Sequence, residues 1–407
     1  MTAEEIIVLG GGIAGKTAAL GLAQQGKRVL HLAPDLATKK NGQTNKLDSS
    51  SWDSRVYAIS KSSKDLFKKL QVWDALPQDR IQAVKDMRIF GDRGHPSDFL
   101  HFSAFQGTVP ELAWIIEAEQ IEIALDLASS FQRNLTRVSA QVLSLETSIE
   151  GVSLETSQGT FQAPLLIAAD GSNSSIRSIM GIDTFIQAYD HTAVIANFKC
   201  TKPNLQTAYQ WFLPGGDILA MLPLPDQKVS MVWSTSTNHA KELVCLCGSS
   251  PEEFSQGVLQ QTEGKLQQVL GDLSLLSTAT SYPLKKLQAK RLLAPETNPR
   301  VILIGDAAHV MHPLAGQGLN LGLRDIRDLL EVMDNKEKLR ALNDPVLLRR
   351  FERMRVGDIQ TLLSATHHLH QLFLSKSTTS QWLRNTGMSL LNKNPTLKRQ
   401  LILRALG

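Results

Sequence analysis

The chain opens with apolar and polar segments whose lengths indicate a strand, a helix and a second strand. Residues 6–9 are apolar and predict a buried strand, residues 13–25 predict a helix, and residues 28–32 predict the next strand. Two more short apolar runs, at 165–169 and 301–304, each lead into a polar turn that is followed by a helical pattern. Short buried strands that alternate with helices predict an α/β fold of the Rossmann-like type.

A different pattern fills the middle of the chain. Between about residues 182 and 284, alternating apolar and polar residues are separated by glycine- and proline-containing turns, which predicts an antiparallel sheet with hairpins. We expect this sheet to form a second domain and one wall of a binding site. We expect four large side chains to lie on one face of this sheet, and we favour the protein core over a pocket as their place. They are Trp211, Phe212, Met221 and Trp233.

The remaining segments complete the expected organisation. Residues 110–131 have helical spacing, three runs between 138 and 162 predict a small meander of strands, and the chain is expected to be helical from 319 to its end, with a break around 375–380. The expected parts are a Rossmann-like domain in three pieces, a sheet domain with an excursion, and a helical extension. The Rossmann-like domain is expected at 1–75, 110–183 and 291–335. The sheet domain is expected at 184–290 with its excursion at 76–109, and the helical extension at 336–407.

Length and composition narrow the class of protein. At 407 residues the chain is too long for one ordinary core, and 42% hydrophobic with 20% charged residues is typical of a globular protein. A net charge of +4 gives no reason to expect nucleic-acid binding. Three cysteines fit neither a disulfide framework nor a zinc site, and no run resembles a signal peptide or a membrane span. We therefore expect a cytoplasmic protein without a bound metal.

The first turn carries a motif with a defined chemistry. Gly10, Gly12 and Gly15 match G-x-G-x-x-G between the first strand and its helix. The first glycine permits the turn, the second lets the backbone approach a pyrophosphate, and the third lets the helix pack closely on the strand. The strand–turn–helix context predicts a dinucleotide-binding site.

The end of the second strand departs from this pattern. An acidic residue about 20 residues after the glycines normally binds the ribose hydroxyls, but the register places Ala33 there. Either Asp35 substitutes for it from a shifted loop, or the adenosine ribose is bound more weakly or through water.

Two further strand ends carry an aspartate. Asp170 begins a turn that reaches Arg177, a pattern that an ordinary helix cap also produces. Gly305-Asp306 follows the strand at 301–304 in the same way. Because ligands bind at the carboxyl ends of strands in α/β folds, both turns are candidates for contact with a ligand.

A glycine-rich helix start follows the last of these turns. His309, His312 and Pro313 lead to Gly316-Gln317-Gly318, where the next helix begins. A helix N-terminus favours negative charge, and glycines let the backbone approach a ligand closely. The segment therefore predicts a site for an electron-rich group, a description that reduced flavin fits.

Two basic features each have more than one interpretation. Arg55 lies shortly after the glycine motif, where it either pairs with a pyrophosphate or shields the flavin, or is a surface residue near the next helix. Residues 390–407 carry four basic and no acidic residues, with apolar residues near one helical face. This segment either lies on an anionic membrane surface or packs on its own domain, and docking of partner enzymes is a further interpretation.

Together these segments resemble a known family. The order and spacing of residues 10–15, 170–177 and 305–306 are similar to those of the class A flavin monooxygenases, the single-component aromatic hydroxylases. More narrowly, the run from His312 to Asn320, HPLAGQGLN, resembles the ubiquinone-biosynthesis hydroxylases, as do residues 53–60, 114–117 and 212–234 and the helical tail. The likeness covers essentially the whole chain.

The resemblance implies a cofactor and its contacts. FAD would be bound without a covalent link by the three-piece domain, and NAD(P)H would reduce it during a transient visit. His309, His312 and Pro313 would lie by the flavin ring, without an assigned catalytic base. The implied cofactor-binding residues are Gly10, Gly12, Ile13, Ala14, Gly15, Asp35, Arg55, Asp170, Gly171, Arg177, Gly305, Asp306, Gly316, Gln317, Gly318, Leu319 and Asn320.

The resemblance also implies a reaction. The family hydroxylates the ring of a polyprenylated phenol with NAD(P)H and O₂, through a flavin C4a-hydroperoxide, and such a substrate would give the basic tail a use at the inner face of a membrane. Two other functions remain open: an FAD-dependent reductase of prenyl double bonds, which consumes no O₂, and a non-catalytic flavoprotein scaffold in a quinone-biosynthesis complex.

Overall fold

A parallel sheet forms the centre of the fold. The computed structural model describes residues 5–34, 52–91, 99–213, 215–311, 317–374 and 394–406. Six strands pair in the order β19-β20-β12-β1-β2-β8, and all neighbours are parallel except β19 and β20. Their bounds are β1 (Ile6–Leu9), β2 (Val29–Ala33), β8 (Leu135–Ser139), β12 (Leu165–Ala168), β19 (Leu293–Ala294) and β20 (Val301–Leu303). The predicted α/β class is therefore confirmed.

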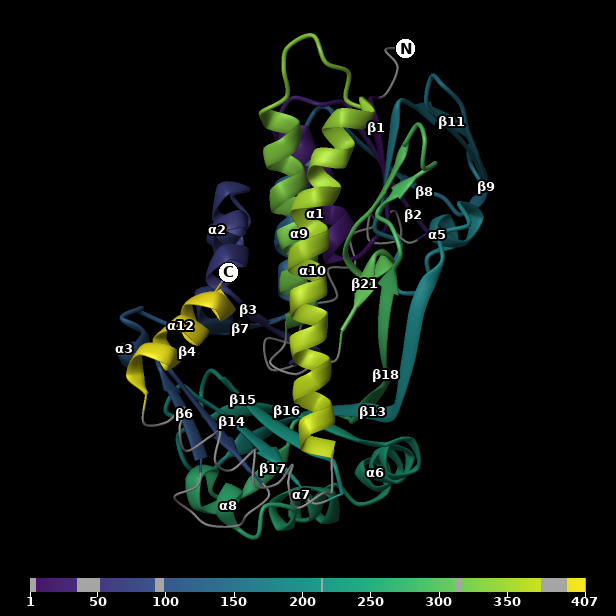
Figure 1. Cartoon of the computed structure of the whole chain (residues 1–407). Helices are drawn as coiled ribbons and strands as arrows, with labels where there is room; N and C mark the ends of the chain where they lie inside the picture. Colours follow the sequence, from purple (N-terminus) through teal and green to yellow (C-terminus); the bar gives the residue numbers. More distant parts are fainter. Residues whose placement is uncertain are drawn as a thin grey trace.

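Helices cover this sheet. α1 (Ile13–Gln24) follows β1, α9 (Gln317–Asp334) packs against α1, and the long α10 (Pro345–Leu374) lies along α9 and reaches the lower part of the molecule (Figure 1). The contact between α1 and α9 is close, since a Cβ on Gly21 would lie 2.5 Å from Leu330 Cδ1. α4 (Ala118–Ser130) also packs on α1. No helix of the described residues is long and apolar enough to cross a bilayer.

A second, nine-stranded sheet lies below the first (Figure 1). Two of its strands, β13 (Thr184–Cys200) and β18 (Thr280–Ala289), are long and extend from the side of the parallel sheet into this one (Figure 1). Its strands are β5 (Asp86–Phe90), β6 (Phe99–Ser103), β13 (Thr184–Cys200), β14 (Thr207–Phe212), β15 (Ile218–Leu224), β16 (Lys228–Ser236), β17 (Leu273–Leu275), β18 (Thr280–Ala289) and β21 (His309–Val310). The sequence did not predict the helices beside it, α6 (Thr237–Ser249), α7 (Pro251–Gln260) and α8 (Lys265–Leu270).

One prediction about this sheet was wrong. Trp211, Met221 and Trp233 share a hydrophobic core with residues of α6, α7 and α8, as predicted for core positions. Phe212 instead packs with Ile218 in a separate cluster. Successive side chains of a strand point to opposite faces, so Trp211 and Phe212 cannot share one face.

A second correction concerns residues 110–131. The segment is a strand, β7 (Ala113–Glu117), followed by α4. β7 lies between β3 (Val56–Ile59) and β4 (Gln82–Val84), with Ile115 opposite Ala58 and Ile116 opposite Tyr57. A buried strand and a helix segment share the same run of apolar residues, so spacing alone did not separate them.

The meander prediction holds with one adjustment. β9 (Val142–Thr147), β10 (Val152–Thr156) and β11 (Gly159–Ala163) form an antiparallel sheet, whereas the first residues of the predicted run belong to β8 in the parallel sheet. The other helices are short or terminal, with these bounds: α2 (Lys61–Lys69), α3 (Ala104–Gly107), α5 (Ser175–Ile179), α12 (Pro395–Leu406) and the 3₁₀ helices η2 (Trp73–Ala75), η3 (Gln78–Arg80) and η4 (Gly305–Ala307).

His31, on β2 of the parallel sheet, makes the stability of the fold depend on pH. Its ring is buried on β2, where Nε2 lies 2.8 Å from the carbonyl oxygen of Gly10. Burial lowers the pKa of His31 from 6.5 to about 4, although the hydrogen bond to Gly10 partly offsets the burial. The unfolded chain therefore takes up a proton near pH 6.5, where folded His31 does not.

We expect this difference to destabilise the fold as pH falls from about 6.5 to about 4. The free energy of unfolding should decrease by roughly 3 kcal/mol over that window because of His31 alone. Urea denaturation at several pH values measures the loss. A His31→Gln variant keeps a side-chain amide for the Gly10 carbonyl but does not titrate, so an equal pH dependence in both proteins would contradict the assignment.

Candidate functional site

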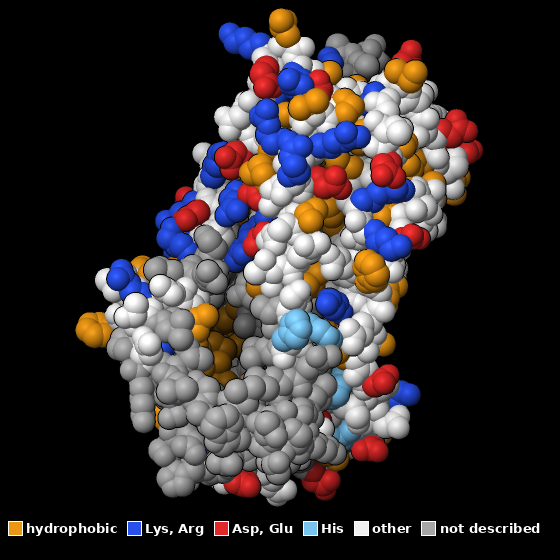
Figure 2. Space-filling view, in the orientation of Figure 1, with side chains coloured by type: hydrophobic (Ala, Val, Ile, Leu, Met, Phe, Trp, Pro, Cys, Tyr) orange, Lys and Arg blue, Asp and Glu red, His pale blue; other side chains and the backbone are white. Residues whose placement is uncertain are grey.

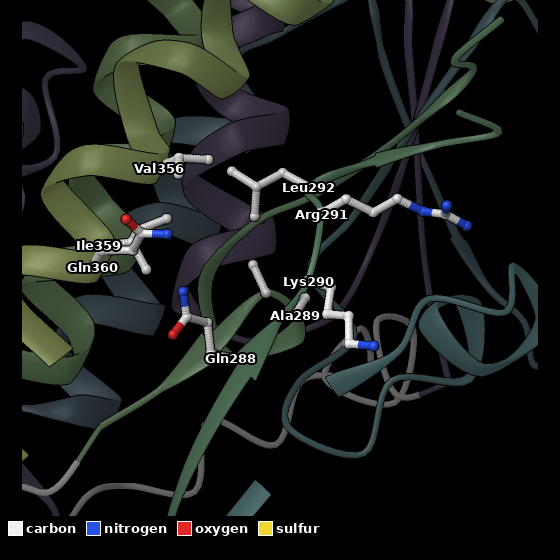
Figure 3. A pocket seen from close by; sticks show the side chains of 9 residues that line it. Gln288, Ala289, Lys290, Arg291, Leu292, Val356, Ile359 and Gln360 are labelled. Carbon is white, nitrogen blue, oxygen red and sulfur yellow. The ribbon is translucent and has the colours of Figure 1, made fainter. Parts of the chain in front are cut away.

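One large cavity lies between the two main sheets. Its volume is about 730 Å³, and its lining comes from the turn after β1, the turn η4, the start of α9 and one face of the nine-stranded sheet. Figure 2 shows a hollow with hydrophobic side chains beside the lobe that carries α3 and α12. A second cavity, between the β18–β19 connection and α10 (Figure 3), has a volume of about 30 Å³ and is too small for more than about one or two waters.

The three motif glycines have different surroundings. Gly10 has a φ of +133°, and a Cβ there would lie 2.1 Å from the carbonyl oxygen of Ala169. A Cβ on Gly15 would lie 2.0 Å from the carbonyl oxygen of Gly10. Apart from the adjoining residues of its own chain segment, no atom of the described residues lies within 4 Å of the Gly12 Cβ position, and Gly12 lines the cavity. Packing therefore requires the first and third glycines, whereas the second leaves open the space that a pyrophosphate needs at the N-terminus of α1.

The turn also shows where the expected acid is missing. Ala33 is the last residue of β2, and a Cβ on Gly11 would lie 3.1 Å from Ala33 Cβ. The register derived from the sequence is thus correct. Asp35 lies outside the described residues, so a contact between Asp35 and the ribose stays a prediction.

Asp306 presents a carboxylate to the cavity. It stands on η4, directly after Gly305, whose φ is +56°. The Asp306 side chain is exposed to the cavity, but protein lies close around it on the other sides, and this partial loss of water raises the pKa of Asp306 against the opposing effects of His309 and Arg55. A carboxylate that accepts hydrogen bonds in such a place suits a ligand rich in hydroxyl groups.

Arg55 lines the cavity from the start of β3. Its guanidinium carbon lies 5.2 Å from the centre of the Tyr57 ring. The next helix, α2, is capped by Ser60, which accepts a hydrogen bond from the backbone of Ser63. Arg55 therefore borders the cavity and α2 does not need it as a cap, while its pairing with an anionic group of the ligand stays a prediction.

The turn after β12 mainly braces the site. Ser174 caps α5, so the helix-cap interpretation applies here, and Asp170 Oδ2 accepts a hydrogen bond from the backbone of Ile176 at 3.2 Å. Arg177 is buried and donates through Nη1 to the carbonyl oxygen of Ala307 at 2.9 Å. Gly171 lines the cavity. Arg177 therefore joins this turn to η4 from behind.

Only some of the first residues of α9 line the cavity. Gln317, Gly318 and Leu319 line the cavity, as do Ile13 and Ala14 from α1. The remaining members of this glycine-rich segment that the sequence singled out, His312, Pro313 and Gly316, lie outside the described residues.

Asn320 does not face the cavity. Its Oδ1 accepts hydrogen bonds from the backbone N–H of Ser60 at 2.9 Å and from Ser63 Oγ at 2.8 Å, and its Nδ2 donates to the carbonyl oxygen of Ala58 at 2.8 Å. Asn320 is buried and ties α9 to β3 and α2. Its bonds position the helix start that borders the cavity.

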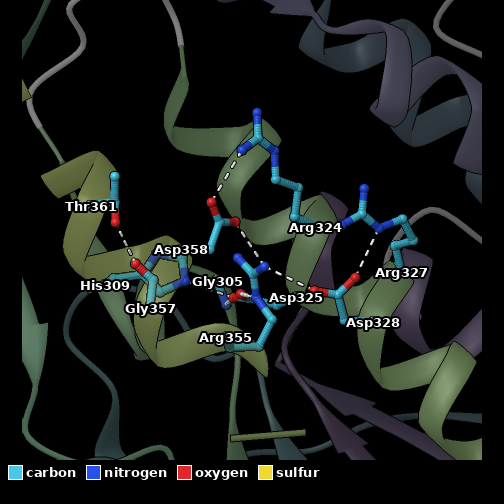
Figure 4. A network of polar contacts seen from close by, with 10 residues as sticks. All are labelled: Gly305, His309, Arg324, Asp325, Arg327, Asp328, Arg355, Gly357, Asp358 and Thr361. Carbon is cyan, nitrogen blue, oxygen red and sulfur yellow. Dashed lines mark hydrogen bonds and ion pairs between the residues drawn. The ribbon is translucent and has the colours of Figure 1, made fainter. Parts of the chain in front are cut away.

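His309 lies behind η4, in a buried ionic network (Figure 4). Its Nε2 is 2.6 Å from Asp325 Oδ2, which also accepts a hydrogen bond from the backbone N–H of Gly305 at 2.9 Å. Arg355 donates to the other oxygen of Asp325 at 2.7 Å. Burial alone would raise the pKa of Asp325, but His309 and Arg355 outweigh it and hold that pKa below the usual range.

Asp325 and Arg355 were missed by the sequence interpretation. A signal existed: Arg355 stands four residues after Phe351 and four before Ile359, both buried, so it occupies the apolar face of α10. A charged residue on an apolar helix face needs a buried partner. The sequence alone does not say where in the chain that partner lies.

The residues bordering the cavity fit FAD. The open space at Gly12 suits a pyrophosphate, Asp306 suits ribityl hydroxyls, and the start of α9 suits the electron-rich end of an isoalloxazine. The buried Oε1 of Gln317 borders the same cavity without a hydrogen-bond partner among the described residues. The described residues contain no group of three or more His, Cys, Asp or Glu side chains that could hold a metal ion.

Known proteins resemble this chain over most of its length. Residues 3–355 match the model of the FAD binding domain family. Escherichia coli K12 3-demethoxyubiquinol 3-hydroxylase is 30% identical over 99% of this chain and 98% of its own length. The mitochondrial ubiquinone biosynthesis monooxygenase COQ6 of Homo sapiens is 30% identical over 98% and 92% of the two chains.

Solved structures share the fold at lower identity. The p-nitrophenol 4-monooxygenase PnpA of Pseudomonas putida DLL-E4 matches with a TM-score of 0.76 and 15% identity, covering 100% of this chain and 98% of that one. Klebsiella pneumoniae HpxO, in complex with FAD and uric acid, matches with a TM-score of 0.72 and 16% identity, covering 98% and 97%.

Proposed function

Since the chain belongs to the FAD binding domain family and, within it, to the ubiquinone-biosynthesis hydroxylases, we propose that it hydroxylates the aromatic ring of a polyprenylated phenol. It is an FAD-dependent monooxygenase of the oxidoreductase class with NAD(P)H as electron donor. One observation supports the polyprenylated phenol as substrate. A single cavity is lined by the glycine turn after β1, by η4, by an apolar face of the nine-stranded sheet and by α12.

Each part of the cavity has a task in this reaction. Bound FAD would supply the redox chemistry that uses NAD(P)H and O₂ to hydroxylate a ring. Gly12 would admit the pyrophosphate, Arg55 would balance its charge, and Asp306 would accept hydrogen bonds from the ribityl chain. The N-terminus of α9 would stabilise negative charge on the reduced ring, and the nine-stranded sheet would exclude water from the ring's other side.

The part of the cavity that α12 lines suits an apolar chain. Leu401 and Ile402 of α12 line it, and α12 packs on α3. Ile402 is buried, and a Cβ on Gly107 of α3 would lie 2.9 Å from Ile402 Cγ2. The tail of the chain is thus part of the cavity wall, as the interpretation that it packs on its own domain predicted. A prenyl chain would gain free energy by leaving water for such a wall.

Oxygen uptake with product analysis tests the proposed function. The FAD-loaded protein receives NADH or NADPH and a geranylated phenol, and O₂ consumption and the product mass are followed. We expect a product heavier by one oxygen atom and O₂ uptake in proportion. Reduction of a prenyl double bond without O₂ uptake would support the reductase instead, and no turnover of any phenol would support the scaffold.

Leu401 provides a test of the proposed chain contact. The side chain is partly exposed while lining the cavity, so Leu401→Asp should leave the fold intact. A carboxylate in the apolar wall should raise KM for a geranylated phenol about tenfold but leave KM for the same phenol without its chain unchanged. Arg399→Ala, an exposed position on α12, is the control. Equal effects on both phenols would contradict the contact.

Contact of residues 390–407 with a membrane or with partner enzymes stays part of the proposal. α12 carries the exposed Arg399, which an anionic surface would attract. Lys398, by contrast, is buried, and that burial lowers its pKa. Sedimentation with anionic liposomes, with and without residues 390–407, tests the membrane contact, which unchanged binding would rule out.

A further inference from the structure

The nine-stranded sheet forms one wall of the cavity, which we call its floor. This floor carries two buried hydroxyl groups. β16 presents Ser230, Val232 and Ser234 to the cavity, since alternate residues of a strand share a face. Ser230 is 0% and Ser234 3% exposed. The Oγ atoms of both serines have no hydrogen-bond partner among the described residues.

The neighbours of Ser234 explain why it has no partner. On β13 the residue opposite Ser234 is Ala193, and on β15 it is Ile218. Both neighbours are apolar and line the same cavity. The residue opposite Ser234 on each adjacent strand therefore offers its hydroxyl no hydrogen-bond partner, and Ser234 borders the cavity.

Ser230 has a polar neighbour on one side. It lies opposite Leu222 of β15 and Asn197 of β13. Asn197 donates through Nδ2 to the carbonyl oxygen of Asp53 at 2.8 Å, while its Oδ1 has no partner among the described residues. Asn197 Oδ1 is an acceptor on the residue opposite Ser230, whereas no such acceptor stands opposite Ser234, so Ser234 is the stronger candidate for contact with a ligand.

A third polar side chain lies on the same floor. Gln210 of β14 is buried and lines the cavity, with Ala220 opposite it on β15. Its amide offers both donors and an acceptor. The floor around these three side chains is largely apolar and includes Ala193, Ile195, Ile218, Ala220 and Val232.

We propose that Ser234, with Ser230 and Gln210, recognises oxygen substituents on the aromatic ring of the substrate. The proposal rests on the proposed function, because it assumes that a phenol occupies this cavity. A buried hydroxyl without a partner destabilises a protein relative to alanine. A bound ring that carries hydroxyl or methoxy groups would give each serine the hydrogen bond that the protein does not supply.

The proposal predicts opposite effects of one substitution on stability and on binding. Ser234→Ala removes an unsatisfied group, so the thermal midpoint of the protein should stay equal or rise. The dissociation constant for a geranylated 2-methoxyphenol should increase about tenfold, as expected for one lost hydrogen bond. For geranylphenol, which lacks the methoxy oxygen, the dissociation constant should change less. Ser230→Ala should act in the same direction.

A serine with a satisfied hydroxyl serves as the matched control. Ser255 of α7 is buried and donates to the carbonyl oxygen of Pro251 at 2.8 Å. Ser255→Ala should leave both dissociation constants unchanged, because Ser255 does not line the cavity.

Binding is measured by the absorbance change of the FAD-loaded protein on titration with each phenol, so the test does not need turnover. If Ser234→Ala lowers the thermal midpoint, or affects the two phenols equally, the inference is wrong. If the wild type binds the methoxyphenol through Ser234 but hydroxylates neither phenol, the inference stands and the proposed function fails. If it binds neither phenol, both fail.

Discussion

Replacing Asp325 by alanine is expected to lower the free energy of unfolding by about 3–5 kcal/mol. The substitution leaves the buried guanidinium of Arg355 without its Asp325 partner and the N–H of Gly305 without its acceptor. The first effect destabilises the contact between α9 and α10. The second releases η4, which carries Asp306 at the cavity. We therefore also expect the purified protein to lose most of its FAD.

Urea denaturation and the ratio of flavin to protein absorbance measure these two effects. Asp325→Asn keeps an oxygen for the N–H of Gly305 but removes the charge that faces Arg355, so it should retain more FAD than the alanine variant. Asp65→Ala is the control for the loss of an aspartate: its pair with Lys61 is half exposed and should contribute less than about 1 kcal/mol. A stable, fully loaded Asp325→Ala protein would show that the network does not hold η4.

Gly12→Val and Gly15→Ala should impair different properties of the protein, FAD binding in the first and folding in the second. Gly12 has a φ of −80°, which any residue adopts, and no other segment of the described chain lies within 4 Å of its Cβ position. Gly12→Val should therefore fold normally but weaken FAD binding on the order of 100-fold, because the side chain fills the space for the pyrophosphate. Gly15→Ala should prevent α1 from packing on the first turn, since its Cβ would meet the Gly10 carbonyl.

Thermal unfolding of the FAD-free proteins and titration with FAD separate these outcomes. The FAD-free Gly12→Val protein should unfold at the wild-type temperature, whereas Gly15→Ala should unfold well below it or accumulate as insoluble protein. Gly257→Ala, in α7, also places a Cβ in open space and should leave FAD binding unchanged. Normal FAD affinity in Gly12→Val would place the cofactor elsewhere.

Local patterns were sufficient for much of the fold. Residues 6–33 were assigned correctly because each element there is long enough to show its own period and ends at a glycine or polar turn. The prediction was wrong at 113–117, where a strand runs directly into a helix. In β14 it placed Trp211 and Phe212 on one face, which the alternation within a strand forbids.

By itself, the sequence determined the α/β class, the dinucleotide turn with its three glycines and the aspartates that follow the strands, because each depends on residues close together in the chain. Only the tertiary structure decided which polar side chains border the cavity and which brace it. Asn320 bonds to Ser60 and Asp325 bonds to Arg355, and the hydroxyl of Ser234 faces apolar neighbours from two other strands. The direction of a polar side chain depends on partners far away in the sequence, since a buried polar group turns toward whatever hydrogen-bond partner the fold brings near it.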